Sequence, residues 1–230
     1  MHYNKQIINY LQSNNILALK LDHALNGVGQ AVSHQIEAIG AGATRALYYT
    51  SCFTDEYQDV CQQQKKEDIR FALGAIRLLQ HDSIVYDMLR IYFEEIFKYK
   101  TYEQIEHIKK MLMAVNVHIA TSSLTGHGFA LATAVLVTQG MNLSMVMSSL
   151  TKHMAGKALM VTGLYSIIQK AADCAHRLHF TCPSYYAALY AQELEMMYFL
   201  IAPLFERTGA LDVQRASDEG IAEIITKMIR

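Results

Sequence analysis

The sequence predicts an all-α protein, and three observations lead to that prediction. Only two of the 230 residues are proline, Pro183 and Pro203, and twelve are glycine, which is too few turn residues for a β-sandwich or a barrel. Alanine, leucine, methionine, glutamine and glutamate, which favour helices, are abundant. Apolar residues recur at helical spacing, and no stretch alternates as a strand would. We expect a single globular domain, residues 1–230, of about nine helices, in which residues 204–230 could form a C-terminal helical appendage.

The first third of the chain contains three expected helices and one polar segment. Residues 3–12, a stretch that begins at Ile16, and residues 31–49 carry apolar side chains at helical spacing. Glycines in the third of these helices are expected to permit close packing against a neighbour, because they follow no strand and open no phosphate-binding fingerprint. Residues 54–67 are polar and are expected to form a solvated helix face or a linker.

Two amphipathic helices are expected next. Residues 69–79 place Ile69, Leu73 and Ile76 on one stripe, which we expect to face the core. Residues 85–96 repeat the same pattern. A break at the His-Asp-Ser sequence that follows the first helix separates the two.

The later helices show recognisable ends. Thr101, with Gln104 three residues on, makes a capping box that begins the next helix. Residues 158–172 and 185–201 are expected to form two apolar helices, and Ser217 caps a short amphipathic helix at the end of the chain.

The rest of the chain is organised around residues 111–151, forty-one positions without Asp, Glu, Lys or Arg. A bilayer crossing takes about 20 apolar residues per helix, so this uncharged run could supply two crossings and a turn. Asn116, His118 and Gln139 are among the polar residues that dilute it. The same run could equally be the central helical hairpin of a soluble fold, hidden by amphipathic helices.

The residues expected to carry membrane insertion are apolar or glycine positions of the run and the lysines beside it. The hairpin positions are Met111, Val115, Leu124, Gly126, Gly128, Leu131, Val135, Val137, Gly140, Leu143, Val146 and Leu150. The expected interface anchors, whose long side chains can reach the membrane surface, are Lys109, Lys110, Lys152 and Lys157.

This layout resembles that of helical pore-forming toxins of the colicin type, in which amphipathic helices sheathe a hydrophobic hairpin until it meets a membrane. The resemblance is architectural, covers mainly residues 103–172 and rests on no sequence motif; the sheath here is not markedly basic. It implies a bacterial toxin or secreted effector that inserts the hairpin and depolarises a target membrane, without a catalytic site or cofactor. Its partners would be a lipid membrane and a cognate immunity or carrier protein.

Two other function classes fit the sequence. One is a soluble helical interaction module, such as an immunity or adaptor protein, with the uncharged run as ordinary core. The other is a metal-dependent helical hydrolase using His81 and Asp82, a pair that resembles the dyad of HD-type phosphohydrolases. Asp55, Glu56 and Asp59 are expected to favour a helix start rather than to bind Mg²⁺. The net charge of −1 gives no attraction for nucleic acid.

Cysteine and histidine also form a local cluster. Cys174, His176, His179 and Cys182 include zinc-ligand types, but their spacing matches no familiar zinc module. Two small buried thiols and two boundary histidines are the simpler interpretation, so no metal is expected.

The start of the chain lacks a basic region leading into an apolar core, so no signal peptide is expected. We therefore expect a protein that is soluble and cytoplasmic when made, with reduced thiols. Export, if it occurs, would take a leaderless route.

Three histidines lie in or beside the uncharged run: His118, His127 and His153. If they were buried in the neutral form, acid would force them to charge and would destabilise the sheltered fold. This is a hypothesis for an acid trigger.

Overall fold

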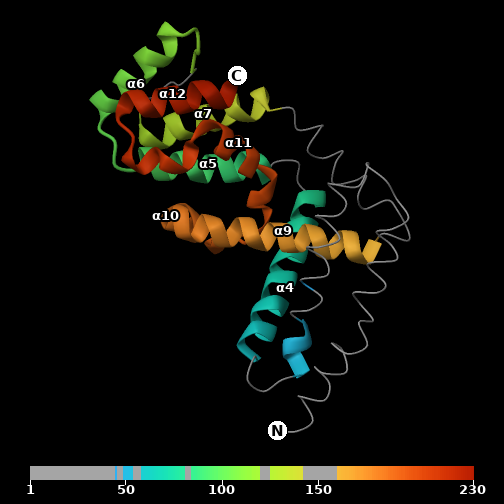
Figure 1. Ribbon diagram of the computed structural model, residues 1–230. Helices are drawn as coiled ribbons and strands as arrows, with labels where there is room; N and C mark the ends of the chain where they lie inside the picture. Colours follow the sequence, from blue (N-terminus) through green and yellow to red (C-terminus); the bar gives the residue numbers. More distant parts are fainter. Residues whose placement is uncertain (1–44, 46–48, 54–57, 81–83, 120–124, 142–159) are drawn as a thin grey trace. The chain divides into compact units, whose positions relative to one another are not determined.

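The computed structural model describes residues 45, 49–53, 58–80, 84–119, 125–141 and 160–230 (Figure 1). The elements in these ranges are all helical, without a strand among them, which confirms the predicted all-α class. The chain divides into two compact units, of which the first holds the described residues 45–69 and 160–170 and the second holds 70–141 and 171–230. That residues 1–230 form a single domain stays a prediction.

The first unit contains the 3-10 helix η1 (Tyr49–Phe53), the first half of α4 (Gln58–Gln80) and the start of α9 (Met160–Thr181). A disulfide joins Cys52 of η1 to Cys61 of α4. The prediction of reduced thiols is therefore wrong for this pair, because the fold brings the two Cα atoms within 4.8 Å of each other.

Helix α4 is continuous, where the sequence predicted a polar segment 54–67 and a separate helix 69–79. It begins at Gln58, and Asp59 lies in its first turn, which confirms the helix-start interpretation for that residue. The buried face of the helix is partly polar; its members are Cys61, Gln64, Glu67, Phe71 and Gly74.

The predicted inward stripe of α4 is wrong. Ile69, Leu73 and Ile76 have 61%, 42% and 51% of their surface exposed. Helical spacing identifies residues that share a face, but not the face that finds a partner. Here the polar side chains of Gln64 and Glu67 occupy the buried face instead.

The second unit is built around three helices that lie side by side, α5 (Ile84–Phe97), α7 (Gly126–Gly140) and α12 (Asp218–Ile229) (Figure 1). Helix α6 (Tyr102–Ala114) packs on α12 and α7. The remaining elements are α10 (Pro183–Ala191), η3 (Glu195–Leu200), α11 (Ala202–Thr208) and η4 (Ala210–Arg215).

An aromatic cluster fills the second unit where α5, α10 and α11 carry their largest side chains. The ring of Tyr92 lies 4.6 Å from that of Phe205 and 5.3 Å from that of Tyr185, measured between centroids. The Tyr92 hydroxyl donates to the Ala210 carbonyl at 2.7 Å, and the Tyr185 hydroxyl donates to the Met88 carbonyl at 2.9 Å. Burial raises the pKa of both tyrosines well above the ordinary value, so both remain neutral donors.

The predicted helix 185–201 is interrupted. α10 ends at Ala191, Glu193 takes a left-handed conformation with φ of 58°, and η3 follows. The break turns Glu195 inward, where its carboxylate accepts from Arg70 over an Nη2 to Oε2 distance of 2.8 Å. A straight helix could not present this carboxylate and also bury the apolar residues of η3.

Two predicted helix ends are confirmed. The capping box of Thr101 and Gln104 begins α6, and the Ser217 hydroxyl accepts from the Gly220 N–H at the start of α12. The predicted helix 158–172 is longer than expected, since α9 runs from Met160 to Thr181.

Candidate functional site

Helix α7 is the described centre of the uncharged run. It has fifteen residues without a formal charge, and it packs against α5, α12 and α6. Its buried residues are Phe129, Ala130, Thr133, Ala134 and Val137. The sequence predicts an apolar helix hidden by amphipathic helices; α7 packs against such helices, but only five of its fifteen residues are buried.

The two threonines within α7 satisfy their hydroxyls inside the helix. Thr133 donates to the Phe129 carbonyl at 2.7 Å, and Thr138 donates to the Ala134 carbonyl at 2.7 Å. Such a bond to the carbonyl four residues earlier removes the need for an outside partner. From Gly128 to Thr138 the side chains of α7 therefore require neither water nor another element for their polar atoms.

Glycines at both ends of α7 allow close backbone contact with its neighbours. A Cβ atom on Gly126 would lie 2.7 Å from the carbonyl oxygen of Phe97, at the end of α5. A Cβ atom on Gly140 would lie 2.7 Å from the carbonyl oxygen of Ile229, at the end of α12. The helix is fitted between these two ends, and larger residues at either glycine would displace it.

Polar contacts join α7 and the helices that pack against it. His127, in the first turn of α7, lies 3.2 Å from the Glu94 carboxylate of α5, measured from Nδ1 to Oε1. Lys100 pairs with Asp218 at 2.7 Å from Nζ to Oδ1, which links the α5–α6 connection to α12.

A further pair joins α6 to α12, where the His107 ring nitrogen Nε2 lies 3.2 Å from the Glu219 carboxylate. The pKa of Glu219 is lowered to about 2 by hydrogen bonds from the Ser217 side chain and the backbone, and by His107. Glu219 is therefore ionised across the physiological range.

The expected hairpin residues that are described have different environments. Met111 and Leu131 are half-buried and Val137 is buried, whereas Val115 and Val135 are 38% and 41% exposed. The first arm of the predicted hairpin ends as a helix at Ala114, followed by Asn116 with φ of 63°. Gly128 belongs to the first turn of α7, where its N–H donates to the Thr125 hydroxyl. Four members, Leu124, Leu143, Val146 and Leu150, lie outside the described residues.

Of the expected lysine anchors, two are described. Lys110 is exposed and pairs with Glu106 at 3.0 Å on α6, and Lys109 is half-buried on the same helix. Lys152 and Lys157 lie outside the described residues.

The hypothesis of an acid trigger is wrong for the two of its three histidines that the structure describes. His118 is exposed, and the side chain of His127 is 69% exposed. Neither side chain is therefore buried in the way that the hypothesis of an acid trigger requires. His153 lies outside the described residues.

The remaining candidate residues, which the sequence offered as possible metal ligands, do not form a common site in the described part of the chain. α9 buries Cys174 and exposes His176 and His179, while Cys182 is buried beyond its end. In the part of the chain that the structure describes, no three His, Cys, Asp or Glu side chains are placed to hold a metal ion. The pair His81 and Asp82, and the acidic residues Asp55 and Glu56, lie outside the described residues.

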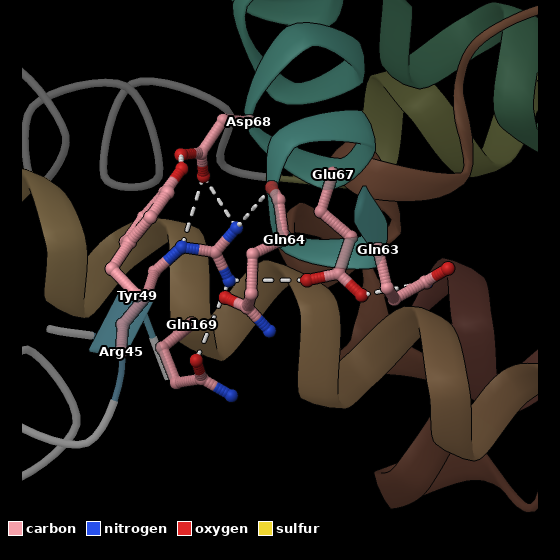
Figure 2. A network of polar contacts seen from close by, with 7 residues as sticks. All are labelled: Arg45, Tyr49, Gln63, Gln64, Glu67, Asp68 and Gln169. Atoms are coloured by element: carbon pink, nitrogen blue, oxygen red, sulfur yellow. Dashed lines mark hydrogen bonds and ion pairs between the residues drawn. The ribbon is translucent and has the colours of Figure 1, made fainter. Parts of the chain in front are cut away.

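Sequence reasoning missed a fully buried charge among the described residues of the first unit. Figure 2 shows the Arg45 guanidinium, fully buried, among side chains of α4 and α9. It donates from Nε to Asp68 at 2.9 Å, from Nη1 to Glu67 at 3.1 Å and to Gln169 at 3.4 Å, and from Nη2 to the Gln64 carbonyl at 3.2 Å. The only sequence signal is a single arginine in a stretch of small and apolar residues, 38–47.

Within the described ranges, none of the helices combines the length and the apolarity that a bilayer crossing demands. No protein-family model matches the chain, and neither the curated proteins nor the solved structures contain a match to it.

Proposed function

We propose that the protein is a membrane-active, pore-forming protein of the toxin or effector class, which shelters its uncharged run in the folded chain and inserts it into a target membrane. The observation that carries the proposal is α7, an uncharged helix that packs against α5, α6 and α12 and is partly buried by them.

The side chains of α7 suit a lipid environment as well as a protein core. Moving apolar residues from a core into hydrocarbon changes their surroundings little, whereas each unsatisfied polar group would cost several kcal/mol there. Thr133 and Thr138 already bond within the helix. His127 and Gln139, the polar side chains without such a bond, lie at its two ends and are exposed.

Length limits how α7 could insert. Fifteen residues make a helix of about 22 Å, which is shorter than the hydrocarbon core of about 30 Å. An inserted helix must therefore recruit uncharged residues beside α7. The absence of charge from residue 111 to residue 151 permits that extension in both directions, so the inserted form would differ from the sheltered one.

The direct test is ion or dye release from liposomes by the purified protein, across pH and anionic lipid content. The key variant is Val135→Lys, because Val135 is 41% exposed and the folded chain can accommodate the lysine. At the centre of a membrane span a lysine costs about 2.5–3.5 kcal/mol, which lowers the insertion equilibrium by about two orders of magnitude.

The matched control is Phe180→Lys, on α9, because Phe180 is 82% exposed and lies outside the run. We expect release by the native protein and by Phe180→Lys, and its loss in Val135→Lys with an unchanged helical spectrum and melting temperature. No release under any condition would overturn the proposal, as would full release by Val135→Lys. The lipid target, a cognate immunity or carrier protein and leaderless export are further parts of the proposal.

A second candidate is a soluble interaction module, which the exposed stripe Ile69, Leu73 and Ile76 on α4 favours. The stripe has the spacing of a helix that binds an amphipathic helix of a partner protein. On this alternative the native protein releases no dye, and Leu73→Lys abolishes the capture of a specific partner from the producing cell. The Phe180→Lys protein would retain that partner.

A further inference from the structure

A disulfide and a set of hydrogen bonds attach Arg45, Tyr49 and Cys52 to the same face of α4. Cys61, Gln64 and Asp68 are spaced by three and four residues, which places them along one side of a helix. Cys61 forms the disulfide with Cys52. Asp68 accepts hydrogen bonds from Tyr49 and Arg45, and the Gln64 carbonyl accepts one from Arg45. The disulfide and the hydrogen bonds thus act on the same short stretch of chain.

The hydrogen bonds of Arg45 form only while that stretch keeps its position against α4. The Arg45 side chain is fully buried, and its guanidinium donates on every edge, to two carboxylates, an amide oxygen and a backbone carbonyl (Figure 2). A buried guanidinium is stable only while such partners are in place. Tyr49 reinforces the arrangement through the Asp68 carboxylate. A displaced segment would lose these bonds together.

The disulfide restricts how far the segment can be displaced. Cys52 and Cys61 are nine residues apart, so the bond closes a short loop and removes most of the arrangements open to a free chain. Neither of the other two cysteines competes for it, because Cys174 and Cys182 are buried in the second unit and are not disulfide-bonded.

We infer that Arg45, Tyr49 and Cys52, with their partners on α4, form a redox-dependent clasp, which an oxidising compartment closes and a reducing one opens. In closure, the two cysteine thiols exchange with the disulfide of an external reagent: the Cys52–Cys61 bond forms, the reagent's disulfide is reduced to two thiols, and the protons of the cysteines pass to them. Opening is the reverse reaction with a dithiol. The inference goes beyond the proposed membrane activity and holds whether or not the protein inserts.

If the disulfide and the hydrogen bonds of Arg45 are coupled, each must stabilise the other. If the disulfide favours the buried, hydrogen-bonded position of Arg45, then that position of Arg45 favours formation of the disulfide, and the two equilibrium constants change by the same factor. A variant that loses hydrogen bonds of Arg45 or Tyr49 must therefore have a disulfide that is easier to reduce. A disulfide that merely happens to lie near the arginine would not show this effect.

The first arm of the experiment measures hydrogen exchange of the full-length protein by mass spectrometry, before and after incubation with dithiothreitol. We expect exchange in peptides covering residues 49–53 to rise by about tenfold or more on reduction, because local opening exposes those amides. Peptides covering α5 and α7 in the second unit should be unchanged. In the double variant Cys52→Ser/Cys61→Ser the fast exchange should appear without reductant and should no longer respond to it.

The second arm measures the thiol content of the protein in defined ratios of reduced and oxidised glutathione. Asp68→Asn and Tyr49→Phe should shift the balance of the Cys52–Cys61 pair toward thiols by about fivefold or more, the lower end of the range of ordinary coupling between sites. The control Asp212→Asn, at an exposed position of η4, should leave it unchanged. Equal thiol balance in all variants, or unaltered exchange of residues 49–53 on reduction, would overturn the inference.

Discussion

Gly126 lies so close to Phe97 that a Cβ atom on the glycine would be 2.7 Å from the phenylalanine carbonyl oxygen. The contact joins the first residue of α7 to the last residue of α5. The uncharged helix therefore packs against α5 through a backbone contact as well as through side chains.

The Gly126→Ala variant should be destabilised. The added methyl group meets a backbone atom that cannot rotate away, and overpacking of this kind costs about 1–3 kcal/mol. Gly220→Ala is the comparison, because its Cβ would meet the Ala216 side chain at 3.1 Å and alanine favours the helix by up to about 1 kcal/mol. Denaturant unfolding should show a clear loss for Gly126→Ala and little change for Gly220→Ala; losses of equal size would argue against the backbone contact.

Gly209 is required for its conformation and not for space. Its φ is 71°, and a Cβ there would have nothing within 4 Å. Gly209→Ala should therefore lose about 1–2 kcal/mol of stability from the left-handed backbone alone. Gly209→Asn should lose less, since asparagine tolerates this conformation at helix ends. Thermal unfolding of the two variants checks the order; an alanine protein as stable as the native one would contradict it.

The Arg70–Glu195 pair should be strongly coupled. The Glu195 side chain is only 3% exposed, so Arg70→Met leaves a carboxylate buried and unpaired, which costs about 3–5 kcal/mol. Arg70→Met/Glu195→Met should recover a large part of that loss, because both charges are then gone.

The exposed pair Arg177 and Glu206, 2.8 Å apart with side chains about half exposed, is the matched control. Arg177→Met should change stability by at most about 1 kcal/mol. Double-mutant cycles at both pairs measure the coupling, and a similar value at the two sites would show that burial does not decide it.

Acid should weaken the α6–α12 contact only at low pH. The folded-state pKa of Glu219 is about 2, below the ordinary value of 4.5, so its contribution is complete above the unfolded value and is lost as the pH falls toward 2. In Glu219→Gln this part of the acid dependence should be missing. Unfolding measured from pH 6 to pH 2 tests the difference; parallel curves for the two proteins would rule out the contribution.

Local features were predictable from the sequence. The capping box of Thr101 and Gln104 and the cap at Ser217 are confirmed, because a hydroxyl that accepts from an N–H three residues away depends only on neighbouring residues. Low proline content and helical spacing likewise predicted the all-α class. The uncharged character of α7 was visible directly in its composition.

Features that depend on distant partners were not predictable. The spacing of Ile69, Leu73 and Ile76 predicted a buried stripe on α4, yet the buried face carries Gln64 and Glu67. The Glu67 carboxylate is stable there because Arg45, twenty-two residues away in the sequence, donates a hydrogen bond to it. The Cys52–Cys61 bond escaped prediction for a similar reason, since residue count alone does not place two thiols in contact.

By itself, the sequence determined the helical class, the caps and the uncharged run, since each depends on the identity and spacing of residues close in the chain. Only the tertiary structure decided which face of α4 is buried, which cysteines are joined and which helices pack against α7. Those outcomes depend on pairs such as Arg45 with Glu67 and Gly126 with Phe97. The free energy of burial belongs to both members of such a pair, so neither local sequence contains it.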